Sequence, residues 1–424
     1  MTSKSPVWHP FTQHATTMEI IPVARGSGAC LETADDDLII DAISSWWVIT
    51  HGHCHPHIVA AVREQAERLD QVIFAGFTHE PAERLARGLI ELTPERLTRV
   101  FFSDSGSTAV EVALKMALGY WRNIGSPRKR IVALEHAYHG DTIGTMSAGA
   151  RGVFNAAYEP LLFDVTRLPF PAEDREQETL DALEVACRTD DVAALIVEPL
   201  ILGAGGMLMW RPETLAEMRR ICDQYGVLLI ADEVMTGWGR TGTMFACEQA
   251  AIVPDILCLS KGITGGNLPL AVTLCAEPIF AAHYSEDRSK TFFHSSSYTA
   301  NPLACAAALA NLEIWTSEPV LARVEALCDM QERRIARLGT DNAFTNVRRM
   351  GTITAFDIDV HDEGYLSEVG PVLQHEFLAR GVLLRPLGNT VYVMPPYCIT
   401  PDQMDAVYSA LNHGVDRVLS GKRS

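Results

Sequence analysis

The stretch Val227–Gly242, "VLLIADEVMTGWGRTG", decides the fold class of this chain. It begins with an unbroken apolar run and then changes to Asp232 and Glu233 before a glycine-rich segment. A run that is apolar on both sides is typical of a strand in a parallel sheet whose two faces are both covered. The stretch therefore predicts a buried strand that carries polar side chains at its carboxyl end.

Five other short runs share this pattern, and helical segments lie between some of them. An alternation of apolar runs with helical segments predicts an α/β domain around a mostly parallel central sheet. The helical segments include 107–121 and 212–226, and the runs are "RVFFSDS" (99–105), "RIVALEH" (130–136), "AALIVEP" (193–199), "DILCLSK" (255–261) and "PLAVTLCAE" (269–277).

The C-terminal part of the chain has a different pattern. A long amphipathic helix is expected over 318–338, a strand over 352–358, and two strands joined by a turn at Gly388–Asn389 within 381–397. Thr400 is an expected N-cap, with Pro401 at the first helical position. We predict a smaller α+β domain, formed by residues 1–44 and 319–424, beside a large domain over 45–318.

Composition and charge exclude several classes of protein. The 424 residues are 47% hydrophobic and 21% charged, as in ordinary globular enzymes, and the net charge of -18 argues against nucleic acid or an anionic membrane as a partner. The longest apolar stretch is broken by Glu198 and Pro199, and the N-terminal residues lack an apolar signal region. The ten cysteines contain no C-x-x-C pair. We expect a cytoplasmic enzyme of small-molecule substrates, without secretory signal or membrane span.

Lys261 and Asp232 follow two of the apolar runs. A lysine at a strand end is often only a surface charge, but a partly desolvated one can lose its proton and form a Schiff base. Asp232 can be a turn former, or the fixed anion that the pyridine nitrogen of pyridoxal phosphate requires. The two residues lie 29 positions apart, about one βαβ unit, so neighbouring strands would bring both to one edge of the sheet.

A small-residue turn before a helix predicts a phosphate site. Gly106, Ser107 and Thr108 would leave free N–H groups at the helix N-terminus, although Thr108 and Glu111 also match a capping box. The turn is neither a Walker loop nor G-x-G-x-x-G, which disfavours a nucleotide. Tyr138, after another strand, can stack on a flat cofactor or simply pack. Together these features favour a single ligand, pyridoxal phosphate.

The segment "THGHCHPHIV", residues 50–59, holds a run of histidines that in principle suits a transition metal. Gly52 and Pro56 break a regular strand, so the alternation need not place the rings on one side. We expect a packed loop and no metal.

The stretches "ADEVMTGWGRTG" (231–242), "SKGITGGNLPLA" (260–271) and "YHGDTIG" (138–144) resemble class III aminotransferases of the fold-type I pyridoxal phosphate superfamily, and the resemblance extends over nearly the whole chain. "VWHPFTQH" (7–14) and "RPLGNTVYVMPPY" (385–397) resemble the branch of biotin biosynthesis that converts 8-amino-7-oxononanoate to 7,8-diaminononanoate, with S-adenosylmethionine as the usual amino donor.

The resemblance implies a role for each matching residue. Lys261 would bind the cofactor covalently and move a proton, and Asp232 would pair with the pyridine nitrogen. Arg385 would bind the substrate carboxylate, for which a guanidinium is chemically suited. For the remaining positions, the resemblance implies phosphate binding by Gly106 and Ser107, with Ser296 and Ser297 from the other subunit of a homodimer, stacking by Tyr138, and a substrate pocket lined by Trp46, Tyr138, Ser295 and Arg385 with Tyr392 near.

Two departures from the branch pattern affect the amino donor. Phe11 stands where the best-known adenosylmethionine-using members have a tyrosine, although members with Phe exist, and Ser295–Ser296 replace a Gly-Pro pair. Phenylalanine keeps the aromatic face but lacks the hydroxyl. We expect Phe11 and Trp46 to form an aromatic wall over the substrate entrance. The donor stays open between S-adenosylmethionine, lysine and a simple amine or diamine.

Other classes of protein stay open at this point. A pyridoxal phosphate aminomutase shares the lysine and the aspartate. A metal-dependent hydrolase would rest on the histidine run, and a nicotinamide oxidoreductase lacks its glycine fingerprint. A non-catalytic binding protein does not account for Lys261 together with Asp232.

Overall fold

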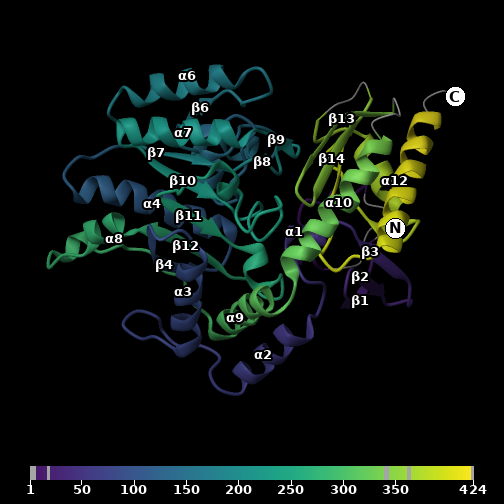
Figure 1. The fold of residues 1–424 in the computed structure, drawn as a ribbon, viewed down its shortest axis with the longest axis horizontal. Coiled ribbons are helices and arrows are strands. Elements are labelled where there is room, and N and C mark those ends of the chain that lie inside the picture. The colour runs from purple at the N-terminus through teal and green to yellow at the C-terminus, as the bar shows by residue number, and fades with distance from the viewer. Residues whose placement is uncertain (1–5, 17–19, 339–342, 361–363, 422–424) are drawn as a thin grey trace.

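The computed structural model describes residues 6–16, 20–338, 343–360 and 364–421. Its centre is a seven-stranded sheet in the order β4-β12-β11-β10-β7-β5-β6 (Figure 1). The strands β11, β10, β7, β5 and β6 run parallel, whereas β12 is antiparallel to both of its neighbours. Their bounds are β4 Leu97–Ser103, β5 Arg130–Leu134, β6 Thr166–Leu168, β7 Val192–Val197, β10 Leu228–Asp232, β11 Ile256–Leu259 and β12 Ala271–Ala276.

The predicted fold class is confirmed, and all six predicted runs form strands of this sheet. Their residues are apolar on both sides because each face is packed. Ile131 and Ala133 of β5 lie in one hydrophobic cluster with helix α4 (Gly106–Asn123), whereas Val132 and Leu134 lie in a second cluster with residues of α6 and α7. The short strand β6 has no long apolar run, and the sequence did not predict it.

Helices and short turns surround this sheet. The helix α7 ends at Gly226, whose left-handed backbone with φ of 61° forms its C-cap. The elements are α2 Pro56–Ala66, α3 Glu80–Leu92, α5 Ile143–Ala148, α6 Glu176–Cys187, α7 Pro212–Tyr225, α8 Glu277–His283 and α9 Pro302–Ser317, with the 3-10 turns η1 Ala156–Leu161, η2 Ala246–Ala250, η3 Lys261–Thr264 and η4 Arg288–Lys290, and the hairpin of β8 Ile201–Leu202 and β9 Leu208–Met209.

The two ends of the chain lie together beside this body (Figure 1). One sheet, β1-β2-β3-β15, pairs the N-terminal strands with a C-terminal one, and a second sheet has the order β13-β14-β16. The division at 45–318 against 1–44 and 319–424 stays our proposal. The bounds are β1 Val23–Ser27, β2 Cys30–Thr33, β3 Leu38–Asp41, α1 Ser44–Trp47, α10 Val320–Leu338, β13 Phe344–Met350, β14 Ile353–Ile358, α11 Val369–Leu378, β15 Val382–Leu383, β16 Thr390–Val393 and α12 Pro401–Gly421.

The C-terminal predictions are largely confirmed. Helix α12 begins at Pro401, and Thr400 and Gln403 exchange side chain to backbone hydrogen bonds as a capping box does. The two strands around Gly388–Asn389 exist, but β15 pairs with β3 and β16 with β14, so they belong to different sheets. Each of the two strands pairs with a strand of a different sheet, and the local turn signal does not indicate this.

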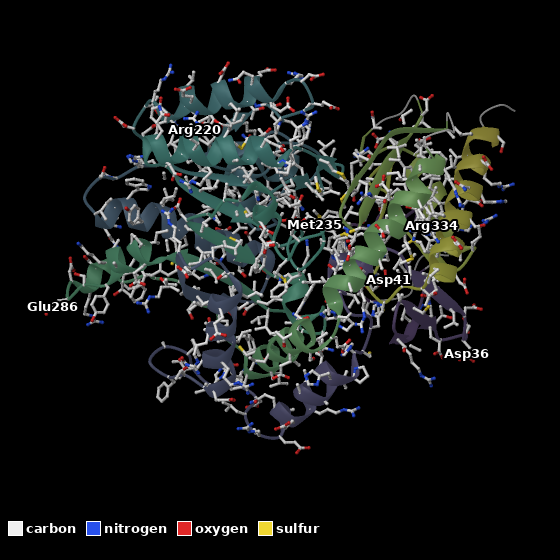
Figure 2. All side chains as sticks on the ribbon, viewed as in Figure 1. Asp36, Asp41, Arg220, Met235, Glu286 and Arg334 are labelled. Atoms are coloured by element: carbon white, nitrogen blue, oxygen red, sulfur yellow. The ribbon has the colours of Figure 1, made fainter. Side chains whose placement is uncertain are left out.

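Two findings concern the chain as a whole. The ten cysteines are free, and six of them are buried. No helix within the described residues is long and apolar enough to cross a membrane. Figure 2 places Met235 where the sheet body meets the C-terminal elements, and this is where the main cavity lies.

Candidate active site

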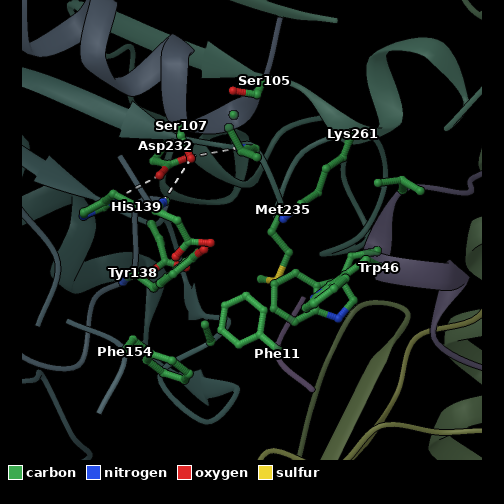
Figure 3. A pocket seen from close by; sticks show the side chains of 18 of the residues that line it. Phe11, Trp46, Ser105, Ser107, Tyr138, His139, Phe154, Asp232, Met235 and Lys261 are labelled. Atoms are coloured by element: carbon green, nitrogen blue, oxygen red, sulfur yellow. Dashed lines mark hydrogen bonds and ion pairs between the residues drawn. The ribbon is translucent and has the colours of Figure 1, made fainter. Parts of the chain in front are cut away.

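A cavity of about 410 Å³ lies at the carboxyl ends of β10, β11 and β5. Its walls come from both parts of the chain, including Pro10 and Phe11 near the N-terminus, Lys261 in the middle and Arg385 near the C-terminus. Figure 3 shows Lys261, Asp232 and His139 in one half of the cavity, and the aromatic side chains of Phe11 and Trp46 in the other. This position matches the general rule that ligands of open α/β sheets bind beyond the strand ends.

The predicted convergence of Asp232 and Lys261 on one sheet edge is confirmed. Strands β10 and β11 are parallel neighbours, and Asp232 pairs in register with Cys258. Lys261 follows the end of β11 at Leu259, and both side chains line the cavity. The conformation of Lys261 is unusual, because its φ of 47° lies in the left-handed region that disfavours residues other than glycine.

Burial makes the ammonium group of Lys261 easier to deprotonate than that of an exposed lysine. Desolvation lowers the pKa of Lys261 from 10.5 to about 8, although the negative charges of Asp232 and Glu198 act in the opposite direction. The Nζ atom lies 4.5 Å from the centroid of the Trp47 ring, which is a cation–π geometry. An amine with this pKa is a nucleophile and a base near neutral pH.

Asp232 is held as a buried acceptor. Its side chain is 4% exposed, its Oδ2 lies 2.8 Å from His139 Nδ1, and its Oδ1 accepts the N–H of Val234. The other ring nitrogen of His139, Nε2, is buried without a hydrogen-bond partner among the described residues. A buried carboxylate fixed in this way can face a protonated nitrogen of a ligand.

The N-terminus of α4 lies at the expected phosphate site, and we call its first turn the α4 cup. The N–H groups of Gly106 and Ser107 belong to its first turn, where N–H groups have no partner within the helix. The predicted capping box of Thr108 and Glu111 is wrong. Ser105 is the N-cap and exchanges hydrogen bonds with Thr108, whereas Glu111 accepts from Thr142 and from the N–H of Gly144. The helix begins three residues earlier than that pattern implied.

Tyr138 and Glu198 lie side by side at the cavity wall. Glu198 is 5% exposed, and its carboxylate accepts the N–H groups of Tyr138 at 2.8 Å and Gly203 at 3.0 Å. Burial raises the pKa of Glu198 to about 7, and burial together with Asp141 raises the pKa of the Tyr138 phenol. The Glu198 carboxylate is therefore not solvated, and it orients the backbone N–H groups at the cavity wall.

The other end of the cavity is aromatic and carries one cation. Phe11 and Trp46 meet edge to face with ring centroids 5.5 Å apart. The Arg385 guanidinium lies 5.3 Å from the centroid of the Trp46 ring, and its Nη2 donates to the carbonyl of Phe11 at 2.9 Å. No carboxylate in the described part of the chain pairs with Arg385. This cation is therefore available to an anionic group of a ligand.

The turn that carries Trp46 and Trp47 is strained and firmly held. Ser44, Ser45 and Trp47 have φ of 55°, 58° and 67°. The carboxylate of Asp41, which is fully buried, accepts the N–H and the hydroxyl of Ser45. The Trp47 indole donates to the Tyr392 hydroxyl at 2.9 Å. Trp46 therefore faces Arg385 while Trp47 faces Lys261.

Ser295, Ser296 and Ser297 do not line this cavity within one chain. The Ser296 hydroxyl bonds to Asp104, next to the α4 cup, and the Ser297 carbonyl accepts from Gln71. A single chain does not test the expected place of Ser295 in the substrate pocket, which stays a prediction.

The histidine run forms separate contacts. His51 bonds to Asn311, His53 to Asp41 and His57 to Glu313, and His55 lies 3.4 Å from Glu318. Among the described residues, no group of three or more His, Cys, Asp or Glu side chains is arranged to hold a metal ion.

Sequence reasoning missed several cavity residues: Trp47, Phe154, Met235 and Tyr365. Phe154 meets Tyr365 at 4.5 Å and Phe11 at 5.9 Å between ring centroids, so it joins the two ends of the chain. Phe154 and Tyr365 lie on irregular segments without periodicity. Trp47 stands beside the predicted Trp46, and only its backbone conformation reveals which side it faces.

Comparisons with known proteins agree with this geometry. Residues 11–415 match the family described as aminotransferase class-III. The chain is 49% identical to the adenosylmethionine-8-amino-7-oxononanoate aminotransferase of Synechococcus elongatus, over 99% of this chain and 100% of that protein. The crystal structure of the enzyme of the same name from Methanocaldococcus jannaschii has a TM-score of 0.91 at 33% identity, covering 96% and 97% of the two chains.

A second solved structure is equally similar in shape. An amine transaminase from an uncultivated Pseudomonas species, solved in a PLP-bound form, has a TM-score of 0.92 at 32% identity, covering 98% of this chain and all of that one. The fold is thus shared by transaminases of different names. The match over most of the chain shows that this protein belongs to the class III aminotransferase family.

Proposed function

We propose that this chain transfers an amino group from S-adenosylmethionine to 8-amino-7-oxononanoate, giving 7,8-diaminononanoate, with pyridoxal phosphate as its cofactor. The names of the relatives support this activity. The observation that carries it is a single cavity with a lysine of lowered pKa, Lys261, at one end. At the other end Arg385 lies in an aromatic lining and has no carboxylate partner among the described residues.

The residues present fit pyridoxal phosphate. The first N–H groups of α4, at Gly106 and Ser107, suit a phosphate. Gly140 leaves room there, since a Cβ atom on it would lie 2.1 Å from Ser107 Oγ. Asp232 suits a protonated pyridine nitrogen, Lys261 a covalent bond to the aldehyde, and the ring of Tyr138 the face of the cofactor. When bound, pyridoxal phosphate supplies an electron sink for the carbon that carries the amino group.

Lys261 has the central chemical role among the protein groups. With a pKa near 8, its Nζ atom could take the proton from the substrate carbon that bears the amino group, hold it and give it back. The Asp232 carboxylate is held by His139 and by the Val234 N–H, and it would stabilise positive charge on a ligand nitrogen. The reaction then occurs in two half-reactions, one for each substrate, in the same cavity.

Arg385 selects the acceptor in this proposal. Its guanidinium can bind the terminal carboxylate of 8-amino-7-oxononanoate with two parallel hydrogen bonds. The aromatic side chains of Phe11, Trp46 and Phe154 suit the apolar chain of that substrate, and Tyr392 supports this wall through Trp47. Arg385 therefore supports an acceptor that carries a carboxylate, as 8-amino-7-oxononanoate does.

We also propose that the active protein is a homodimer in the cytoplasm. Within one chain, Ser296 bonds to Asp104, next to the α4 cup. In the proposed dimer, Ser296 and Ser297 of a second copy would reach the phosphate site of the first. The ten free cysteines suit a reducing compartment.

The test is to mix the purified holoenzyme with S-adenosylmethionine, lysine or a simple amine in separate samples and to follow the visible absorbance of the bound cofactor. Loss of the band with S-adenosylmethionine alone supports the proposed donor. Loss with lysine alone replaces the donor and keeps the acceptor. Loss only with simple amines contradicts the biotin-pathway function and favours an amine transaminase, the activity of one structural neighbour.

A further inference from the structure

The first histidine of the run 51–57 has a contact that the proposed chemistry does not use. His51 is 5% exposed, and its Nε2 lies 2.9 Å from Oδ1 of Asn311 in helix α9. Asn311 is fully buried, and its Nδ2 donates to the carbonyl oxygens of Gly262 and Ile263, both at 3.1 Å. These two carbonyls belong to η3, the turn that begins with Lys261.

This geometry determines where the proton of His51 lies. The carbonyls of Gly262 and Ile263 can only accept, so the amide nitrogen of Asn311 must face them and its oxygen must face His51. His51 therefore donates from Nε2. Burial lowers the pKa of His51 to about 4, so the ring is neutral at physiological pH.

The charged neighbours of His51 do not change this assignment. His55 and Arg323 disfavour a positive charge on the ring, and Glu318 favours one, but each has a smaller effect than burial. His51 Nδ1 is buried without a hydrogen-bond partner in the described part of the chain. Burying a ring with one nitrogen unsatisfied costs free energy. A role for the other nitrogen, which bonds to Asn311, would explain why the ring is buried here.

The Lys261 turn needs an external support. Lys261 has the left-handed φ of 47°, and such a backbone persists only where the surroundings hold it. The turn has four residues and ends at Gly265, also left-handed with φ of 64°. A Cβ on Gly265 would lie 3.4 Å from Asn311 Oδ1 and 3.7 Å from His51 Cδ2, so both side chains pack directly on the turn.

We propose that His51 and Asn311 form a positioning relay that holds the Gly262 and Ile263 carbonyls and so keeps Lys261 in its left-handed conformation, directed into the cavity. His51 orients the Asn311 amide, and the amide fixes the turn. Neither residue lines the cavity, so both are positioning residues rather than catalytic ones. The inference rests on the proposed function, in which Lys261 is the lysine that binds the cofactor.

The primary test is the holoenzyme of Asn311→Asp. Aspartate keeps the shape of asparagine but replaces the donor that faces two carbonyls by an acceptor. We expect the pH midpoint of the cofactor's visible absorbance to move by at least about half a pH unit, because the charge environment and position of Lys261 change. The first half-reaction should slow by about 10- to 100-fold, the cost of misplacing a reacting group by roughly 1 Å.

Gln331 provides a matched control in the C-terminal part. It is also fully buried, its Nε2 donates to the carbonyls of Thr352 and Val393, and its Oε1 accepts from the Tyr408 hydroxyl. Gln331→Glu makes the same chemical change at a side chain that bonds to Thr352, Val393 and Tyr408 and not to the Lys261 turn. We expect it to lower the unfolding temperature while the cofactor titration and the half-reaction stay as in the wild type.

A pair of His51 variants tests the relay without altering Asn311. In His51→Gln, the amide nitrogen of the new side chain can replace Nε2 as the donor to Asn311. In His51→Phe, the new side chain has no donor. We expect His51→Gln to retain the wild-type titration and His51→Phe to shift it in the same direction as Asn311→Asp. This pair also decides the question if Asn311→Asp does not fold.

The outcomes separate the relay from the proposed function. If the wild type shows no visible band with pyridoxal phosphate, or Lys261→Ala keeps it, the proposed function fails. If the wild type behaves as proposed but Asn311→Asp and His51→Phe titrate and react like the wild type or like Gln331→Glu, the relay is overturned and both residues only stabilise the fold.

Discussion

The Nζ atom of Lys261 lies 4.5 Å from the centroid of the Trp47 ring, and the indole N–H of Trp47 is in turn bound to the Tyr392 hydroxyl at 2.9 Å. The adjacent Trp46 turns the other way and meets the Arg385 guanidinium at 5.3 Å. Two consecutive tryptophans thus face the two cations of the cavity. The left-handed backbone of Trp47 produces this split.

Trp47→Leu should lower the pKa of Lys261 below its value of about 8. Loss of the ring removes a cation–π interaction of about 0.5–2 kcal/mol that favours the ammonium form, equal to roughly 0.4–1.5 pH units. The measurement is the pH dependence of the rate at which the apoenzyme binds pyridoxal phosphate covalently. Trp46→Leu is the matched control and should leave this dependence unchanged. Equal behaviour of the two variants would contradict the assignment.

Lys261→Met should stabilise the apoenzyme at pH 7. Burial lowers the pKa of Lys261 in the folded state to about 8 from 10.5, so the unfolded chain binds this proton more strongly. The resulting penalty is fully present below pH 8 and disappears as the pH rises to about 10.5. We expect methionine to raise the free energy of unfolding by about 1–3 kcal/mol at pH 7 and by little at pH 10.5.

The measurement for this variant is denaturant unfolding of the apoenzyme at both pH values. Lys129→Met removes a lysine whose side chain is exposed, and it should change stability little at either pH. A gain from Lys261→Met that is the same at both pH values would show that apolar packing, rather than the buried charge, is responsible.

The sequence predicted the catalytic half of the cavity better than the substrate half. Asp232 and Lys261 end buried parallel strands, so the strand order alone brings them together. Phe154 and Tyr365 lie on irregular segments, where no hydrophobic period indicates which way a side chain points. They meet only because the two ends of the chain fold against the sheet body, a long-range event that local patterns do not encode.

The wrong prediction of the α4 cap has a local cause. Ser105 and Thr108 provide the cap of α4, whereas the pattern favoured Thr108 with Glu111, since several small polar residues precede this helix and each suits an N-cap. Ser295 was assigned to the substrate pocket through a motif, and its absence from the cavity of its own chain does not test that assignment. A motif does not say which copy of the chain supplies its residues.

Asp232→Asn should slow the first half-reaction by at least about 100-fold, since a fixed charge that stabilises the reacting ligand is lost. The pKa of Lys261 should also fall, because the Asp232 charge raises it. Single-turnover kinetics and the pH dependence of cofactor binding measure the two effects. Asp255→Asn alters an equally buried carboxylate that pairs with Arg96 and Arg219, so it should reduce stability without changing the half-reaction. If Asp255→Asn slowed the half-reaction and Asp232→Asn did not, Asp232 would have no role in the reaction.

Arg385→Lys should raise the KM for 8-amino-7-oxononanoate by about tenfold or more, because lysine keeps the charge but cannot form two parallel hydrogen bonds to a carboxylate. The half-reaction with the amino donor should change by no more than about twofold, since that step does not use the carboxylate. Steady-state kinetics with each substrate varied in turn measures both. An unchanged KM for the acceptor, or an equal loss in both half-reactions, would refute the carboxylate role.

Phe11→Ala should impair turnover much more than folding. The Phe11 side chain is 43% exposed, so its removal should cost less than about 1 kcal/mol of stability. Its ring, however, contacts both Trp46 and Phe154 at the aromatic wall, and each such pair contributes about 0.5–1.5 kcal/mol to an ordered arrangement. We expect kcat/KM to fall by about tenfold or more, while the unfolding temperature changes little.

Trp8→Ala is the control, since Trp8 is 90% exposed and does not line the cavity. Equal losses of stability and activity in Phe11→Ala would mean that the N-terminal segment supports the fold and does not act as the wall of the substrate entrance.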